Sequence, residues 1–329
     1  MSYPESVDID DLDRQVIHAL QLDGRAPFNR IAEVLGVSDQ TVARRYRRLR
    51  SADLLRVVAV PPAGYLAHGR WLLRLRCAPG AAPPVAEALA RRTDTAWVQL
   101  VSGGTEVQCI TRAATPDDAE RLLLDKLPRT SRVVDVAAHS VLHVFYGSPS
   151  PIRLLDALTR EQAAALGPQP EFAADPSDIP QCSPDDRPLL DVLARDGRTA
   201  LPDLAAATGW SASTVRRRVD HLRSLGALHF YAEFDPRLVG LGHGARLWMT
   251  AAPADLDAAG RALASHPEVV FAAATTGATN LAASVLCRDA HDLYRYLTDR
   301  AAALPGVARI ETTPIIRDVK RLGRVLPRA

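Results

Sequence analysis

The spacing of apolar residues from position 10 to about 58 predicts three short helices. The first is expected over residues 11–22, because its apolar residues recur at helical spacing on one face. Pro27 opens a second helix over 29–35, which Gly36 ends, and Ser38 can cap a third that runs to about 51. The buried stripe of the third helix is expected to be Val42, Tyr46 and Leu49. Three such helices with a glycine-containing turn are typical of a helix-turn-helix.

The period changes to that of strands from residue 71 onward. Strands are expected over 71–77, 97–102, 106–111 and 133–145, with helices over 84–92 and 117–127. Gly103-Gly104 lies between the second and third strands and favours a hairpin. The order βαββαβ predicts a ferredoxin-like sheet with helices on one face.

The whole pattern occurs twice. Asp23-Gly24-Arg25 recurs as Asp196-Gly197-Arg198, and Gly36 recurs as Gly209, at a constant step of 209 − 36 = 173. This period is far longer than that of solenoid repeats, so the copies are duplicated domains. The predicted fold class is α+β, a tandem duplication of a winged helix-turn-helix and a ferredoxin-like βαββαβ domain. The expected domains are helix-turn-helices at 8–60 and 183–233, sheet domains at 66–147 and 242–323, and a linker at 148–182.

The linker is rich in proline, and residues 152–166 within it favour a short helix. We expect the rest to act as a tether that is stiff in places.

Composition narrows the classes of function. The chain has 329 residues and a formal net charge of +2, so total charge neither requires nor excludes a nucleic-acid partner. Its four cysteines form no CxxC pair, and we expect neither a metal site nor a cofactor. The start has no apolar leader and no stretch is apolar for the roughly 20 residues of a membrane span. The expected location is the cytoplasm.

The third helix carries the candidate chemistry of the first copy. With the buried stripe on one side, Thr41, Arg44 and Arg48 fall on the opposite side at ~100° per residue. Arginines this dense repel one another, and a DNA backbone relieves that repulsion. Polar residues at the start of such a helix contact base edges, with Gln40 suited to adenine and Arg44 to guanine. The predicted DNA-binding residues are Ser38, Asp39, Gln40, Thr41, Arg44, Arg45, Arg47 and Arg48. A solvated, arginine-rich surface helix is the alternative.

The second copy has the same helix with different polar residues. Asp220-His221 replace Arg47-Arg48, so we expect weaker binding to DNA phosphates. Ala212-Ser213 replace Asp39-Gln40, so we also expect a different base preference. The predicted DNA-binding residues are Ser211, Ser213, Thr214, Arg216, Arg217 and Arg218.

The chain resembles the Lrp/AsnC (leucine-responsive/asparagine-regulator) transcription factors. In the helical region the resemblance rests on Asp11-Leu-Asp13-Arg14, Asp23-Gly24-Arg25, Ile31-Ala32, Gly36-Val-Ser38, Thr41-Val42, Arg45, Leu49 and Leu54-Leu55. In the sheet it continues with Thr276-Gly277-Ala-Thr-Asn280 and with Leu304-Pro305-Gly306-Val307, Ile310-Glu311-Thr312. It covers both copies and leaves out the linker, and most members of the family carry one copy per chain.

The resemblance implies that the sheet domain dimerises and binds a small effector, often an amino acid, near the hairpin loop. Glycines there allow close approach of a ligand, and adjacent N–H groups can bind a carboxylate. The implied effector-binding residues are Ser102, Gly103, Gly104, Thr105, Glu106, Thr276, Gly277, Thr279 and Asn280. The family usually has Asp where Glu106 and Asn280 stand, and an ordinary hairpin turn is the alternative in each copy.

The duplication predicts an intrachain pseudo-dimer, in which one chain supplies two recognition helices about one DNA turn, roughly 34 Å, apart. Because the two helices differ, the preferred DNA site is expected to be an imperfect palindrome. The expected partners are double-stranded DNA, an amino-acid-like effector, and further copies of the chain in a homo-oligomer; no membrane is expected.

Two other functions are compatible with the same double module. Siroheme decarboxylases share it, but the stretches that match their catalytic motifs, 95–99 and 269–273, contain no histidine, so no catalytic residue is expected. The other alternative is a modulator of related regulators whose DNA binding is impaired, to which Asp220 and His221 point in the second copy.

Overall fold

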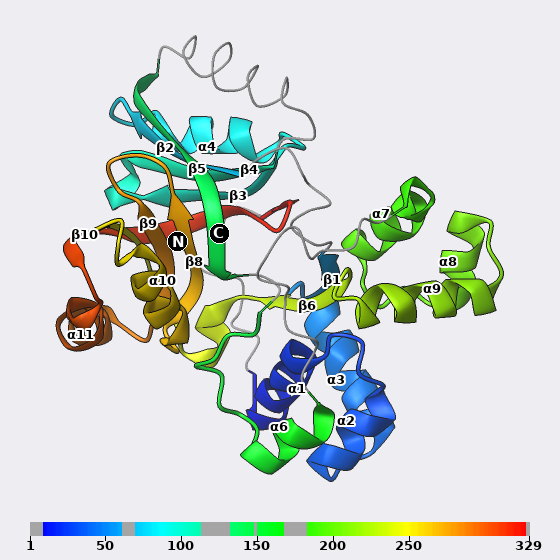
Figure 1. Ribbon diagram of the computed structural model, residues 1–329. Helices are drawn as coiled ribbons and strands as arrows, with labels where there is room; N and C mark the ends of the chain where they lie inside the picture. The colour runs from blue at the N-terminus through cyan, green and yellow to red at the C-terminus, as the bar shows by residue number, and fades with distance from the viewer. Residues whose placement is uncertain (1–8, 61–69, 113–131, 148–149, 168–182, 327–329) are drawn as a thin grey trace. The chain divides into compact units, whose positions relative to one another are not determined.

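The computed structural model describes residues 9–60, 70–112, 132–147, 150–167 and 183–326, which belong to two compact units. Unit 1 combines Met1–Tyr65 with Ser148–Gly240, and unit 2 combines Leu66–Gly147 with Leu241–Ala329. Each unit therefore contains corresponding parts of both sequence copies (Figure 1).

Unit 1 contains both helix-turn-helices. The helices are α1 (Asp11–Leu22), α2 (Phe28–Leu35) and α3 (Asp39–Ser51) in the first copy, and α7 (Arg187–Arg195), α8 (Leu201–Thr208) and α9 (Ala212–Ser224) in the second. Asp10 caps α1, and Gly36 ends α2 in the left-handed conformation that favours glycine. Val42, Tyr46 and Leu49 are buried, which confirms the predicted stripe.

The strand that follows each helix-turn-helix pairs with the same strand of the other copy. Strands β1 (Leu55–Val60) and β6 (His229–Phe234) form an antiparallel ribbon. Val58 lies opposite Tyr231, and 231 − 58 = 173, so equivalent positions face each other across a pseudo-twofold axis. Figure 1 shows one group of helices on either side of this ribbon.

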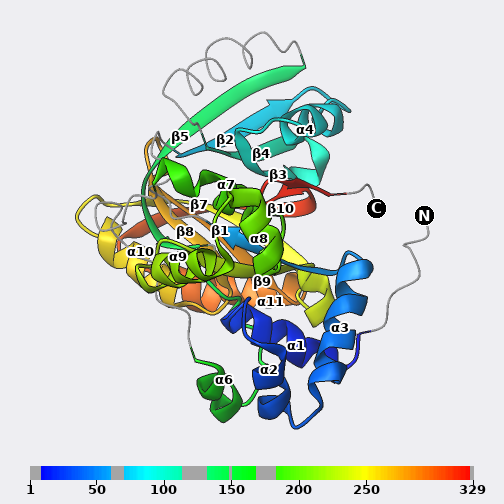
Figure 2. The same ribbon diagram turned by 90° about the vertical axis from the view of Figure 1, so that its right-hand side faces the viewer.

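The first part of the linker packs on the first helix-turn-helix. Helix α6 (Arg160–Leu166) is shorter than expected, and Thr159 caps it. The residues before it turn toward α1, where the N–H of Ile152 donates to Gln21 Oε1 at 3.0 Å and that of Leu158 to His18 Nδ1 at 3.1 Å. These polar partners and buried leucines make residues 150–167 part of unit 1 rather than a tether (Figure 2). Residues 168–182 lie outside the described residues.

Unit 2 contains both sheet domains. The first copy supplies β2 (Arg70–Cys77), α4 (Ala82–Ala90), β3 (Thr95–Val101), β4 (Glu106–Arg112) and β5 (Val133–Tyr146). The second supplies β7 (His243–Ala251), α10 (Leu256–Ser265), β8 (Val269–Thr275), β9 (Leu281–Cys287), α11 (Ala290–Arg295), β10 (Val307–Arg321) and the short β11 (Arg324–Val325). The helix predicted over 117–127 lies outside the described residues.

The strand orders are β3-β4-β2-β5 in the first copy and β8-β9-β7-β10 in the second, which confirms the predicted ferredoxin-like topology. Apolar residues on one face of each sheet pack under α4 in the first copy and under α10 and α11 in the second.

The two sheets join edge to edge within the chain. Val141 of β5 pairs with Thr275 of β8, and Ile315 of β10 pairs with Val101 of β3. Because 315 − 141 and 275 − 101 both equal 174, the two junctions are pseudo-twofold equivalents. Because β7 and β10 are already paired within the second copy, these two junctions close the strands into a ring. The predicted intrachain pseudo-dimer is therefore present in unit 2.

Candidate nucleic-acid interface

The N-termini of α3 and α9 present the short polar residues that the sequence singled out. Ser38 Oγ accepts from the N–H of Thr41 at 3.1 Å, and Ser211 Oγ accepts from that of Thr214 at 3.2 Å. Both serines therefore cap their helices as expected. The side chains beside these caps are exposed: Asp39, Gln40, Ala212 and Ser213.

Two arginines of α3 are held by a buried carboxylate. Asp13 of α1 has no exposed surface, and its Oδ2 accepts from Arg45 Nη1 at 3.2 Å and from Arg48. Arg45 also pairs with Asp10 at 2.6 Å. These ion pairs join α3 to α1, so Arg45 and Arg48 have a structural role within the first helix-turn-helix. Both arginines were predicted to contact DNA, but in the structure their guanidinium groups are paired with Asp13.

The second copy repeats this arrangement. Arg218, the equivalent of Arg45, donates from Nε and Nη2 to the two carboxylate oxygens of buried Asp186, at 2.7 and 2.6 Å. Such bidentate pairs are strong and fix the geometry of the guanidinium. His221, the equivalent of Arg48, is exposed.

The repeated Asp-Gly-Arg motif holds the two copies together. Arg50 pairs with Asp196 at 2.7 Å, and its equivalent Arg223 pairs with Asp23 at 3.0 Å, so the two ion pairs cross the pseudo-twofold axis. Arg198 donates to the carbonyl oxygens of Gly24 and Ala26 at 2.8 and 3.1 Å.

The glycines of this motif are required by close approach between copies. A Cβ on Gly24 would lie 2.9 Å from the carbonyl oxygen of Phe230, and one on Gly197 would lie 3.0 Å from Cγ1 of Val57. From the sequence we interpreted this motif only as evidence of duplication. Its identical recurrence in both copies was the one feature that could have indicated an interface between them.

Apart from Arg50, which pairs with Asp196, four arginines are exposed on the two recognition helices: Arg44, Arg47, Arg216 and Arg217. None of them forms an ion pair with a described residue. Each helix therefore offers two such guanidiniums. Arg48 has no arginine equivalent in the second copy, but it adds no further one in the first, because it is paired with Asp13. The remaining difference is that exposed Asp220 stands where the first copy has Arg47.

The first hairpin loop offers less to a ligand than its sequence suggested. Ser102, Gly103 and Gly104 have positive φ angles in a tight turn that continues into Thr105. Glu106 is buried, and both of its carboxylate oxygens accept from Arg74, at 2.9 and 3.2 Å. Arg74 also bonds Glu311 at 2.5 Å and lowers the pKa of that carboxyl group. The Glu106 carboxylate is thus already paired with Arg74, so it offers less to the effector that the resemblance implies at this loop.

The second loop is closed in a different way. Asn280 Oδ1 accepts from the N–H of Ala251 at 2.9 Å, and its Nδ2 donates to the carbonyl oxygen of Ala251 at 2.9 Å. Thr276 bonds His139 and Ser140 of β5, and a Cβ on Gly277 would collide with the His139 ring. Thr275 Oγ1 donates to the carbonyl oxygen of Thr279 at 3.0 Å. Thr276 thus joins this loop to β5, whereas Asn280 and Thr279 hold the loop within the second copy.

Other classes of site receive no support within the described ranges. Cys77, Cys109 and Cys287 are buried free thiols, and burial raises the pKa of Cys109 to about 12. Among the described residues no cluster of histidine, cysteine or acidic side chains has the arrangement of a metal site. No described helix is long and apolar enough to span a membrane.

Comparisons with known proteins agree with this architecture. An AsnC-type helix-turn-helix domain matches residues 9–50 and again 185–223, and an Lrp/AsnC ligand binding domain matches 245–325. An uncharacterised HTH-type transcriptional regulator of Pyrococcus horikoshii is 31% identical over 42% of this chain and 87% of its own length. The regulatory protein AsnC of Escherichia coli is 28% identical over 41% of this chain and 93% of its own length.

A solved structure of the siroheme decarboxylase NirDL covers 95% of this chain and 93% of its own, with a TM-score of 0.60 and 11% sequence identity. At that identity it shows that the double-module fold is shared and says nothing of activity. The relatives that match by sequence are HTH-type transcriptional regulators, and each matches a stretch about as long as one copy. The chain belongs to the Lrp/AsnC family of transcription regulators.

Proposed function

We propose that this chain binds double-stranded DNA in a sequence-specific manner through both recognition helices of one polypeptide. The observation that carries this proposal is the pair of capped helices α3 and α9, each with exposed polar residues at its start and two exposed arginines without an ion pair in the described structure. Such helices place their first residues at base edges and their basic residues at phosphates.

The two helix-turn-helices act as one rigid DNA-binding unit in this proposal. The β1–β6 ribbon and the crossed ion pairs Arg50–Asp196 and Arg223–Asp23 fix their relative position. A regulator with one copy per chain needs a second chain to present two helices, whereas this chain presents both. Further association of such pseudo-dimers into a homo-oligomer is part of the proposal, as is action in the cytoplasm.

The sheet unit is proposed to respond to a small effector without catalysing a reaction. Glu106 and Asn280 are satisfied internally, so an effector at the loops would meet backbone groups and the residues Ser102–Thr105 and Thr276–Thr279. A siroheme decarboxylase activity has only the shared fold in its favour, and incubation with siroheme under reducing conditions is expected to give no product.

The proposal is tested by selecting bound duplexes from a random pool and measuring affinity by fluorescence anisotropy. Titration from about 50 to 200 mM salt should weaken binding by roughly 10³-fold or more if six or more phosphates are neutralised. The double variant Arg44→Ala/Arg217→Ala should bind more weakly, and Arg261→Ala on α10 serves as the matched loss of an arginine elsewhere. Absence of salt-sensitive binding to any duplex would contradict the proposal.

A further inference from the structure

The closed ring of strands in unit 2 has an inner face that carries polar and charged side chains. On β7, Leu247 and Met249 pack under the helices of the second copy, so the alternating residues Arg246 and Trp248 point to the opposite face. There Trp248 packs with Leu72 of the first copy, which places this face between the two sheets. Arg246 is only 3% exposed, so it is a cation enclosed within unit 2.

The guanidinium of Arg246 has N–H groups that the described structure leaves unused. Its Nη2 donates to Gln99 Oε1 at 3.0 Å, whereas Nε and Nη1 have no hydrogen-bond partner among the described residues. The ring of Phe271, whose centroid lies 5.6 Å from Cζ, adds only a weak cation–π contact. Burial lowers the pKa of Arg246 to about 10, and the charge of Asp318 opposes this lowering only in part. A buried cation with unused donors is costly unless an anion or a polar group meets them.

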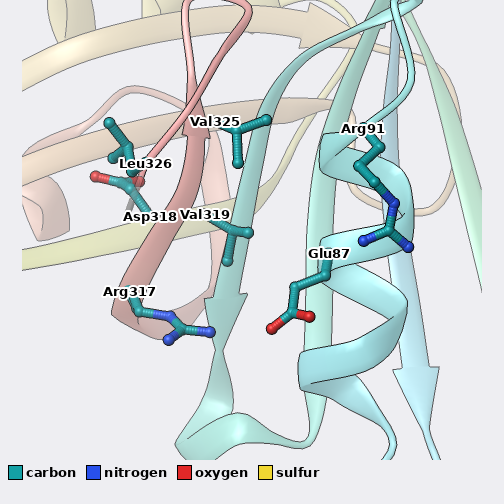
Figure 3. A pocket seen from close by; sticks show the side chains of 7 residues that line it. All are labelled: Glu87, Arg91, Arg317, Asp318, Val319, Val325 and Leu326. Atoms are coloured by element: carbon teal, nitrogen blue, oxygen red, sulfur yellow. The ribbon is translucent and has the colours of Figure 1, made fainter. Parts of the chain in front are cut away.

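The carboxylates of the inner face are engaged with other groups. Figure 3 shows the Asp318 side chain pointing away from α4, as expected for the inner face of the ring. Its Oδ1 accepts from Gln99 Nε2 at 2.8 Å, and its Oδ2 pairs with Arg321. Glu106 and Glu311 share the guanidinium described above. No carboxylate of the described residues therefore lies at ion-pair distance from the buried arginine on β7.

Further hydrogen-bond donors lie next to Arg246. Thr313 of β10 and Ser284 of β9 are directly opposite it in the sheet and are buried, so their hydroxyl groups are on the same face. Trp248, two residues along β7, has an indole N–H without a partner among the described residues. Donors around a buried guanidinium favour an anion over a cation.

This group of residues occurs in one copy only. The residues at the equivalent positions of the other copy are apolar: Leu72 for Arg246, Ala273 for Gln99 and Ile110 for Ser284, since 246 − 72, 273 − 99 and 284 − 110 all equal 174. The pseudo-twofold axis therefore does not generate a second group of donors, and one site per chain is expected.

We propose that the inner face of the ring binds one monovalent anion of atomic size, such as chloride, at Nε or Nη1 of Arg246. These donor atoms are enclosed, which favours a single atom over a polyatomic anion such as phosphate. The ion supplies the negative charge that Arg246 lacks. Because Arg246 of the second copy bonds Gln99 of the first, the bound ion stabilises the pairing of the two sheets. The proposal concerns unit 2 alone and does not depend on DNA binding.

The experiment is thermal unfolding of the full chain while sodium chloride replaces sodium gluconate at a constant ionic strength of about 0.2 M. Tryptophan fluorescence reports mainly on unit 2, which contains three of the four tryptophans. Chloride should raise the melting temperature with a saturable, one-site dependence, by roughly 5 °C when it is about 100-fold above its dissociation constant. Arg246→Leu, which introduces the residue of the other copy, should lose this dependence. Arg309→Leu removes an exposed arginine of β10 and should retain it.

A second variant supplies the anion from the chain itself. Ser284→Asp places a carboxylate directly opposite Arg246, and its melting temperature should no longer depend on chloride. Equilibrium dialysis with radioactive chloride should find one ion per parent chain and none in either variant. If Arg246→Leu does not fold, Ser284→Asp and the dialysis of the parent protein still decide the matter. A parent protein that melts independently of chloride, dialysis that finds no bound ion, or a saturable chloride dependence retained by a folded Arg246→Leu or Ser284→Asp would each overturn the proposal.

Discussion

At the scale of single residues, the arginines of the recognition helices, apart from Arg50 and Arg223, which pair with the other copy, divide into two groups with different roles. Arg45, Arg48 and Arg218 are paired with buried Asp13 or Asp186, whereas Arg44, Arg47, Arg216 and Arg217 are exposed. An arginine already paired with a buried carboxylate must break that pair to meet a phosphate. The exposed group is therefore the source of the expected electrostatic affinity.

Loss of an exposed arginine should reduce the salt dependence of DNA binding. Arg44→Ala and Arg217→Ala occupy equivalent positions, and each should lower the slope of log K against log salt by about 0.9, as expected for one lost phosphate contact. The measurement is anisotropy at several salt concentrations. Asp220→Arg provides the converse change, since it gives the second helix the residue found at position 47, and it should raise the slope. Unchanged slopes in all three variants would remove these residues from the interface.

Loss of a buried carboxylate should act on stability instead. Asp186→Asn leaves Arg218 without its charge partner at a fully enclosed position, and breaking such a pair is costly. Because Arg218 keeps some solvent contact, we expect a loss of about 2 kcal/mol in the free energy of unfolding of unit 1, or roughly 4–8 °C in its melting temperature. Arg217→Ala, one residue earlier and exposed, is the control and should melt like the parent protein. Equal melting temperatures for Asp186→Asn and the parent would refute the anchoring role.

At the scale of elements, the sequence predicted where most helices and strands begin and end, but not which side chains pair between them. Periodicity and caps located α1, α3 and β2 because these signals are local: an N-cap serine, a glycine stop, an apolar stripe. The Arg48–Asp13 pair was not predictable, because a helical wheel gives the direction of a Cβ and not the reach of a guanidinium. Likewise Glu106 lies 32 residues from Arg74, and nothing local to either residue indicates their contact.

The linker element illustrates the same limit. Its proline content suggested a tether, yet residues 150–167 pack on α1 and α2 through single polar contacts such as Leu158 N–H to His18 Nδ1. That hydrogen bond requires an unprotonated Nδ1. Burial lowers the pKa of His18 below its ordinary 6.5, and the charge of Asp156 opposes this lowering only in part.

The docking of this segment should therefore depend on pH. A histidine whose pKa is lowered by folding stabilises the docked state fully above pH 6.5, and this contribution is lost as the pH falls through the lower, folded pKa. The intrinsic rate of amide hydrogen exchange falls between pH 7.5 and 5.5, so the measured rates are divided by it, and the resulting protection of residues 150–167 should decrease over this range. His18→Gln retains an acceptor but does not titrate, so its exchange should lose this dependence, and an unaltered profile in that variant would contradict the role of His18.

At the scale of the whole chain, duplication within one polypeptide allows the two halves to diverge. A homodimer has identical halves, so its two recognition helices and any ligand sites are identical. Here the strands of the two copies pair about a pseudo-twofold axis in both units, but equivalent positions of the two copies carry different residues. The buried arginine at position 246, which stands where the other copy has Leu72, is one result of that divergence. The starts of α3 and α9 are another.

This divergence predicts an operator with two unequal half-sites. The first helix presents Asp39 and Gln40 where the second presents Ala212 and Ser213, and we expect side chains at these positions to contact base edges. Selection from random duplexes should therefore yield an imperfect palindrome. Ala212→Asp/Ser213→Gln makes the second helix start like the first, and the selected sequence should move toward a perfect palindrome of the first half-site. Asp220→Arg, which changes charge away from the helix start, should raise affinity without changing the selected sequence. Recovery of a perfect palindrome by the parent protein would show that the two helices read the same bases despite their different residues.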